Sequence, residues 1–181
     1  RHAIYKSGAK ELAARHGQAL TFMAKYDERE GNSCHIHLSL RGTDGDIVFA
    51  DDDRDGGRSE LFDSFLAGVL ATMREFSYFY APNINSYKRF AAGSFAPTAV
   101  AWGTDNRTCS LRVVGHGAGL RVENRVPGGD VNPYLAVAAM LAGGHVTCSR
   151  AAPSPARPSA TRSSTTTSTP RTSNSRPSTP R

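Results

Sequence analysis

The sequence has 181 residues, of which 39% are hydrophobic and 21% charged, and its formal net charge is +6. This length allows one domain or slightly more. It contains no run of about 18 apolar residues, which argues against a transmembrane helix, and its start lacks the pattern of a signal peptide. The three cysteines show no metal-ligand spacing, so we expect a protein of the reducing cytoplasm without a membrane partner.

The first 24 residues predict a helix followed by a strand. Residues 2–16 have apolar side chains at helical spacing, and Gly17 can end the helix. Residues 19–24 are mostly apolar and predict a strand. Residues 41–58, which come after the next strand, are rich in Asp and Gly and predict a surface hairpin or loop.

The segment Gly31–Leu40 alternates strictly between apolar and polar side chains, which predicts a strand with one buried face. The other face carries His35 and His37, with Ser39 next to them. An isolated His-x-His pair is by default a solvated polar face. A metal needs three or four ligands, so this pair would need carboxylates from elsewhere in the chain.

The middle of the chain predicts a long helix and then several strands. Ser59 is a suitable N-cap, and Ala81-Pro82 should end the helix just after Phe79. Asn132-Pro133 is a strong start for a last helix, with Gly143-Gly144 as its expected stop. Between the two helices we expect a polar loop at 83–90 and strands at 99–103, 109–114 and 119–126.

The last predicted strand places charges on one face, since Arg121, Glu123 and Arg125 alternate with apolar residues and Asn124. A cross-strand ladder of salt bridges would explain this pattern without any function. Combined with two imidazoles and further arginines, however, such a face suits a metal-bound anionic phosphate. Guanidinium groups bind oxyanions in a fork, and Glu and His bind divalent cations.

Five motifs in this order resemble the catalytic domain of the glutamine synthetase family. They are the segment 31–40, Asn85-Ser86-Tyr87-Lys88-Arg89, Asn106-Arg107-Thr108, Arg121-Val122-Glu123-Asn124-Arg125 and Asn132-Pro133-Tyr134-Leu135-Ala136. The resemblance covers residues 1–145 as part of that domain. It implies an α+β fold with a mainly antiparallel, curved sheet flanked by helices. The implied reaction forms γ-glutamyl phosphate from ATP and glutamate, after which ammonia or an amine displaces phosphate.

The resemblance also implies a role for each matching residue. His35 and Glu123 would bind Mg²⁺ or Mn²⁺, and Arg89 and Arg107 would be catalytic. The glutamate substrate would contact Gly31, Arg89 and Arg125, and ATP would contact His37, Ser39, Arg107, Arg112 and Arg121. The full-length protein would form a homo-oligomeric ring, as in dodecameric members, with each active site built from two neighbouring subunits.

Two departures from the ammonia-dependent members point to a different acceptor. Glu30 precedes Gly31 where those members have Asn, and Phe95 replaces a flap Glu that binds and deprotonates ammonium. An aromatic ring cannot act as a base. We therefore expect a ligase that prefers a primary amine, such as a polyamine or ethanolamine, over ammonia.

The chain lacks an initiator Met, an N-terminal domain and several metal-ligating glutamates of the family, so we expect a fragment that is inactive alone. From Val146 to Arg181 it has six Arg, no Lys, no acid and no large apolar residue, which predicts a disordered tail. We favour a reading-frame error as its origin. The alternatives to the ligase function are a non-catalytic interaction protein that uses the basic tail to bind nucleic acid or acidic partners, and a pseudogene product. Without an aromatic residue in the tail, we expect no nucleic-acid partner.

Overall fold

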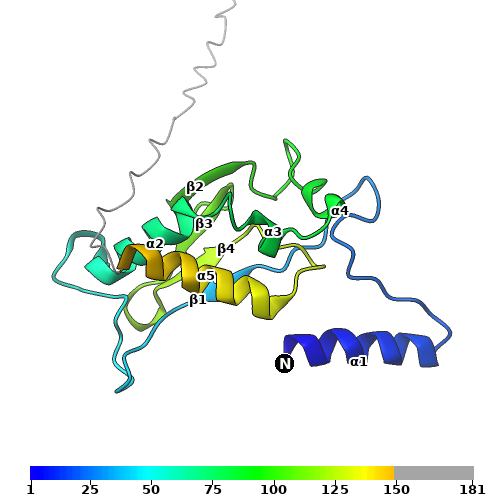
Figure 1. The fold of residues 1–181 in the computed structure, drawn as a ribbon, viewed down its shortest axis with the longest axis horizontal. Helices are drawn as coiled ribbons and strands as arrows, with labels where there is room; N and C mark the ends of the chain where they lie inside the picture. The colour runs from blue at the N-terminus through cyan, green and yellow to red at the C-terminus, as the bar shows by residue number, and fades with distance from the viewer. Residues whose placement is uncertain (149–181) are drawn as a thin grey trace, which may run out of the picture.

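The computed structural model describes residues 1–148, in which two helices cover one face of a four-stranded sheet (Figure 1). No helix within this range has both the length and the apolar character that crossing a membrane requires. The predicted disordered tail lies outside the described residues, apart from Val146–Cys148, which complete the last helix. The elements in chain order are α1 His2–Arg15, β1 Ile36–Leu38, the 3-10 turn Asp55–Gly57, α2 Glu60–Ala71, α3 Ser77–Tyr80, α4 Ile84–Tyr87, β2 Ala99–Thr104, β3 Cys109–Val114, the 3-10 turn Gly117–Gly119, β4 Arg121–Asn124 and α5 Pro133–Cys148.

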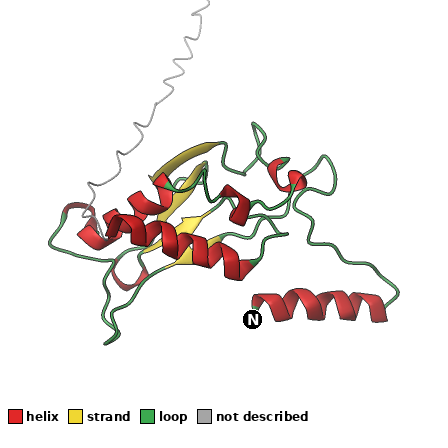
Figure 2. Ribbon diagram, in the orientation of Figure 1, coloured by secondary structure: helices red, strands yellow, loops and turns green. Residues whose placement is uncertain are grey.

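The sheet has the strand order β1-β4-β3-β2 (Figure 2). β4 pairs antiparallel with both β1 and β3, whereas β2 pairs in parallel with β3. The α+β class and the mainly antiparallel sheet predicted from the sequence are therefore confirmed. Strands β2, β3 and β4 also lie where strands were expected.

The two faces of the sheet differ in character, as the alternation in the sequence predicted. Val122 on β4 pairs in register with Val113 on β3 and with Leu38 on β1. Val113 and Val122 belong to the hydrophobic core together with Phe65 of α2 and Met140 of α5, and the partly buried Leu38 packs against it. The opposite face presents the charged residues, so burial of apolar area on one face fixes the orientation of the other.

Helices α2 and α5 approach closely because glycines line their contact. A Cβ atom on Gly68 would overlap the carbonyl oxygen of Gly143, and one on Gly144 would overlap the ring of Phe65. The prediction that Gly143-Gly144 ends the helix is wrong, since α5 continues to Cys148. The close helix packing that these glycines allow offsets the low helix propensity of glycine.

The start of α2 is as predicted, but its end is not. The hydroxyl of Ser59 accepts a hydrogen bond from the Phe62 amide at 3.1 Å, as an N-cap does. The helix ends at Ala71 rather than near Phe79, and Thr72 turns its hydroxyl back onto the Gly68 carbonyl at 2.9 Å. A separate turn, α3, then ends before Ala81-Pro82, and the expected polar loop at 83–90 contains the one-turn helix α4.

The predicted strand at 19–24 does not form. The Met23 and Ala24 carbonyls accept hydrogen bonds from the Asn32 side chain and amide, both at 2.8 Å, and Phe22 packs edge-on against Tyr5 of α1. These contacts with a loop provide hydrogen-bond partners for the backbone carbonyls of Met23 and Ala24. The His-x-His strand is also shorter than expected, because only Ile36–Leu38 pairs continuously, with an isolated bridge at Ser33.

Substitution Gly68→Ala should destabilise the fold, because the new methyl group would overlap the backbone of α5. We expect a loss of about 1–3 kcal/mol in the free energy of unfolding, measured by urea denaturation. Gly8→Ala in α1 is the matched control, since nothing lies within 4 Å of a Cβ atom there. Equal stability of the two variants would show that the close contact between α2 and α5 is not required.

Candidate functional site

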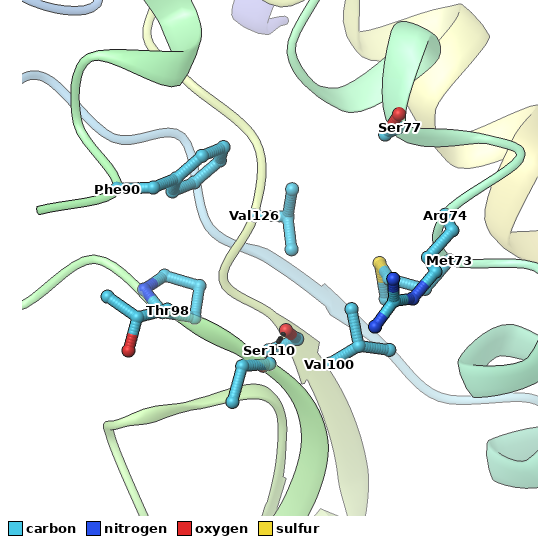
Figure 3. A pocket seen from close by; sticks show the side chains of 10 residues that line it. Met73, Arg74, Ser77, Phe90, Thr98, Val100, Ser110 and Val126 are labelled. Carbon is cyan, nitrogen blue, oxygen red and sulfur yellow. Dashed lines mark hydrogen bonds between the residues drawn. The ribbon is translucent and has the colours of Figure 1, made fainter.

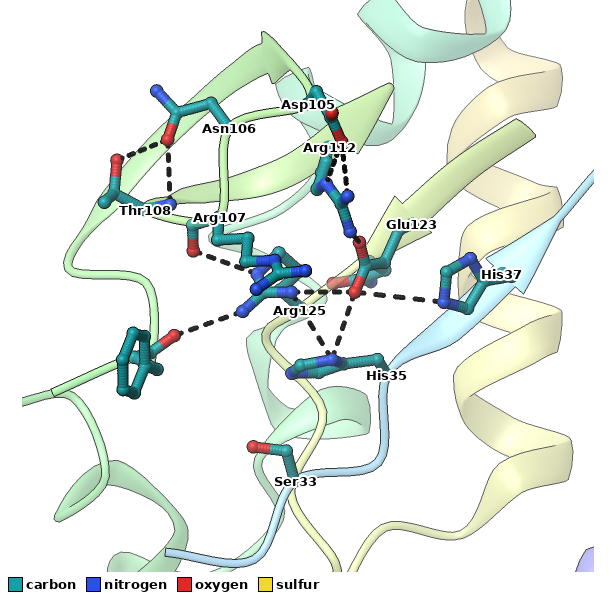
Figure 4. Close-up of polar contacts among 12 residues, drawn as sticks. Ser33, His35, His37, Asp105, Asn106, Arg107, Thr108, Arg112, Glu123 and Arg125 are labelled. Atoms are coloured by element: carbon teal, nitrogen blue, oxygen red, sulfur yellow. Dashed lines mark hydrogen bonds and ion pairs between the residues drawn. The ribbon is translucent and has the colours of Figure 1, made fainter. Parts of the chain in front are cut away.

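Four side chains converge on the carboxylate of Glu123 in the middle of the charged face (Figure 4). We call Glu123 and its partners His35, His37, Arg112 and Arg125 the Glu123 cluster. Oε1 of Glu123 lies 2.8 Å from Nη1 of Arg125, 3.0 Å from Nδ1 of His35 and 3.8 Å from Nε2 of His37, and Oε2 accepts from Nη1 of Arg112 at 2.9 Å. The structure thus brings together residues up to 90 positions apart in the sequence.

Strand register places three members of the Glu123 cluster in one row. Glu123 on β4 lies directly opposite Arg112 on β3 and opposite His37 on β1. Directly opposed residues point to the same face with their Cβ atoms about 5 Å apart, which suits ion pairing. His35 and Arg125 lie just beyond the ends of β1 and β4 and complete the cluster.

Glu123 is only 2% exposed, and its partners offset the cost of burying a charge. Burial alone would raise its pKa, but the hydrogen bond from Arg112 and the charge of Arg125 lower it below the ordinary value. Burial, followed by the charge of Arg125, lowers the pKa of His35. The cluster therefore holds an ionised carboxylate beside a neutral imidazole.

Arg125 connects the Glu123 cluster to two loops. Its Nε donates to the carbonyl oxygen of Arg107 at 3.0 Å, and its Nη2 donates to that of Phe95 at 3.3 Å. The guanidinium is almost fully buried, at 4% exposure. Arg125 thereby holds the loop that carries Phe95 and the turn between β2 and β3 against the sheet.

Asp105 is a member of the site that the sequence did not predict. It adopts the left-handed region at φ +53°, and its carboxylate accepts from Nε of Arg112 at 3.0 Å and also from Nη2. The hydrogen bond from Arg112 lowers the pKa of Asp105, and the Asp105 and Glu123 bonds raise that of Arg112. An Asp in a short turn seven residues before a strand arginine was the available signal.

Of the remaining predicted nucleotide-binding residues, Arg121 and Arg107 contact members of the Glu123 cluster. Nε of Arg121 donates to Nδ1 of His37 at 3.1 Å, which joins Arg121 to the cluster indirectly. The side chains of Arg107 and Ser39 are exposed. Arg107 contributes its carbonyl oxygen to the site, and its guanidinium is accessible to a ligand.

Arg89 and Gly31 form a second part of the site. Arg89 is 2% exposed and donates from Nη1 to the Val126 carbonyl at 3.0 Å and from Nη2 to the hydroxyl of Ser33 at 3.2 Å. Burial lowers its pKa, an effect that the charge of Asp130 opposes. A Cβ atom on Gly31 would lie 2.7 Å from Cγ of Arg89, so the glycine allows this close approach.

The residues expected to bind a metal do not form a complete metal site. His35 and Glu123 are adjacent, as the prediction required, but no group of three or more His, Cys, Asp and Glu residues within 1–148 could hold a metal ion. Both oxygens of Glu123 also accept hydrogen bonds from guanidinium groups. The described residues therefore supply at most two ligands of the three or four that a cation needs.

Two cavities lie near these residues. A small one of about 70 Å³ is lined by Glu30, Gly31, Arg89, Phe95 and Arg125, among others. A larger one of about 330 Å³ is mostly apolar and is lined by residues such as Met73, Phe90 and Val100 (Figure 3). Predicted site residues line the small cavity and none of them lines the large one.

Comparison with known proteins agrees with this geometry. The family model described as glutamine synthetase, catalytic domain, matches residues 1–173. The chain is 68% identical over 143 residues to gamma-glutamylethanolamide synthetase GlnA4 of Streptomyces coelicolor, covering 79% of this chain and 30% of that protein. It is 51% identical over 141 residues to glutamate–isopropylamine ligase of a Pseudomonas species, covering 77% of this chain and 31% of that protein.

Solved structures show the same relationship. The structure titled apo GmaS without ligand has a TM-score of 0.76 and 37% identity, over 87% of this chain and 36% of that one. An ADP complex of GmaS has a TM-score of 0.78 and 36% identity. This chain spans about a third of the length of these relatives. On this evidence of fold, motifs and sequence, the chain belongs to the glutamine synthetase family and is part of its catalytic domain.

Proposed function

We propose that this chain forms part of the active site of an ATP-dependent ligase that joins glutamate to a primary amine through γ-glutamyl phosphate. The Glu123 cluster is the observation that carries this proposal, because it presents preorganised guanidinium groups on a sheet face beside an ionised carboxylate. The two relatives described above are named for ethanolamide and isopropylamine products or substrates, which supports an amine acceptor over ammonia.

The proposed roles follow from position in the site. Arg107, with its exposed guanidinium, would contact the transferred phosphoryl group, and Arg112 and Arg121 would bind ATP together with His37 and Ser39. Gly31, Arg89 and Arg125 border the small cavity and would bind glutamate. Arginine forks match the geometry of carboxylate and phosphate groups.

A divalent cation would supply charge neutralisation for the phosphates when bound. His35 and Glu123 could contribute to it only with further ligands from outside residues 1–148. Within this chain, Glu123 first serves to orient Arg112 and Arg125. We propose that the full-length, cytoplasmic protein completes the site in a ring of subunits.

The acceptor can be identified by assaying the longer protein that contains this sequence with ATP, glutamate and either ammonium, ethanolamine, isopropylamine or putrescine. We expect faster ADP release with at least one amine than with ammonium, and a γ-glutamyl amide detectable by mass spectrometry. Reactions without glutamate are the control. The 181-residue chain alone should show no turnover, because its described residues do not complete a metal site. Fastest turnover with ammonium would contradict the amine preference.

Substitution Glu123→Gln should destabilise the chain by roughly 3 kcal/mol, because it leaves the buried Arg125 guanidinium without a counter-charge and leaves Arg112 with Asp105 alone. Urea unfolding followed by circular dichroism would measure this loss. Glu75→Gln is the matched control, since Glu75 is exposed and has no ion pair with the described residues. If both variants unfold at the same urea concentration, Glu123 does not hold the arginines in place.

A further inference from the structure

The lining of the small cavity beside the Glu123 cluster carries more positive than negative charge. Lys25, Arg89 and Arg125 contribute three cations, and Glu30 contributes the only carboxylate. The Glu30 carboxylate is exposed and makes no ion pair or hydrogen bond with any residue in the described part of the chain. By contrast, Arg89 and Arg125 are bound to carbonyl oxygens of the protein. Glu30 is therefore an anion available to a ligand in surroundings that otherwise attract anions.

The loop that carries Glu30 is held in place at both ends. The amide of Lys25 donates to Oδ1 of Asn85 at 2.8 Å, and the Asn85 side chain donates to the Lys25 carbonyl at 2.5 Å. After Glu30, the amide of Asn32 donates to the Ala24 carbonyl at 2.8 Å. These bonds join the two ends of the loop and position Glu30 at the edge of the cavity.

Phe95 lines the same cavity from a separate loop. The Ser94 hydroxyl donates to the Arg89 carbonyl at 3.1 Å, and Arg125 holds the Phe95 carbonyl at 3.3 Å, so the backbone of this loop is anchored. The Phe95 side chain is nonetheless 74% exposed. An anchored aromatic ring with most of its surface free can bind a cation or an alkyl chain over its face.

We propose that Glu30 binds the ammonium group of the acceptor amine, while Phe95 packs against the carbon chain that bears it. A cavity of about 70 Å³ holds only a few waters, so a group bound within it lies close to every side chain of the lining. An ammonium group meets three cations there and one carboxylate, which makes Glu30 its only favourable charged partner. The rest of the amine extends along Phe95 towards solvent.

The larger cavity is a poorer site for the same ligand. Its lining contains Arg74 and no acidic residue, so it would repel an ammonium group (Figure 3). This role of Glu30 rests on the proposed amine ligase function, and it adds a residue that selects the acceptor. Glu30 thereby favours acceptors that carry a positive charge over neutral or anionic ones of the same size.

The role of Glu30 can be tested by binding, without turnover. The ¹⁵N-labelled 181-residue chain is titrated with ethanolamine at neutral pH, and separately with glutamate, while amide shifts are followed by NMR. Glu30→Gln should weaken ethanolamine binding about tenfold or more, as expected when one charge-assisted hydrogen bond is lost. Glu28→Gln is the matched control, because it removes an exposed acid from the same loop that does not line the cavity.

The expected result is weaker ethanolamine binding in Glu30→Gln alone, with shifts in wild type at residues 30 and 95. Equal affinity of Glu30→Gln and wild type, or no ethanolamine binding by wild type, would overturn the role of Glu30. Phe95→Ala supplies a second measurement, since it should also weaken ethanolamine binding but not glutamate binding. Failure of wild type to bind glutamate would instead count against the proposed function, so the two failures are distinguishable.

Discussion

The ionised carboxylate of Glu123 is the interaction on which the charged face depends. A carboxylate at 2% exposure costs several kcal/mol of desolvation unless partners replace its water. Arg112 and Arg125 do so at 2.9 and 2.8 Å, and His35 at 3.0 Å. Because these partners come from three neighbouring strand segments, the carboxylate also fixes how the strands present their side chains. The arginines are therefore held in place before any ligand binds.

Packing on the opposite face makes this arrangement possible. The apolar residues of β3 and β4 are buried under α2 and α5, whose glycines permit a close approach. A one-residue shift of β4 would exchange Val122 and Glu123 between the faces, which would put a charge into the core. The register that buries Val122 is thus the one that places Glu123 opposite Arg112 and His37. The hydrophobic core and the charged site lie on opposite faces of the sheet, but the same strand register determines both.

The sequence predicted those features that depend on local periodicity or on family motifs. Alternation identified β4 and its charged face, and the resemblance correctly placed His35 next to Glu123. Features that depend on distant partners were missed. In the sequence, Gly143 and Gly144 are typical of a helix end. In the structure, Gly68 and Phe65 pack on them. In the sequence, Asp105 is an ordinary turn residue. In the structure, the turn places its carboxylate next to Arg112. Residues 19–24 have a strand-like composition but find no strand to pair with.

The position of a carboxylate, rather than the number of carboxylates, distinguishes the two ends of the site. Glu123 is saturated by guanidinium groups, so it orients cations and has little capacity left for a cationic ligand. Glu30 has no such partner in the described chain and lies where the cavity meets solvent beside Phe95. An anionic ligand would therefore be attracted to the arginines of the interior, and a cationic ligand to Glu30 at the rim. Two ligands of opposite charge would then bind at adjacent positions, one at the arginines and one outside them at the rim, because each meets its counter-charge in a different loop.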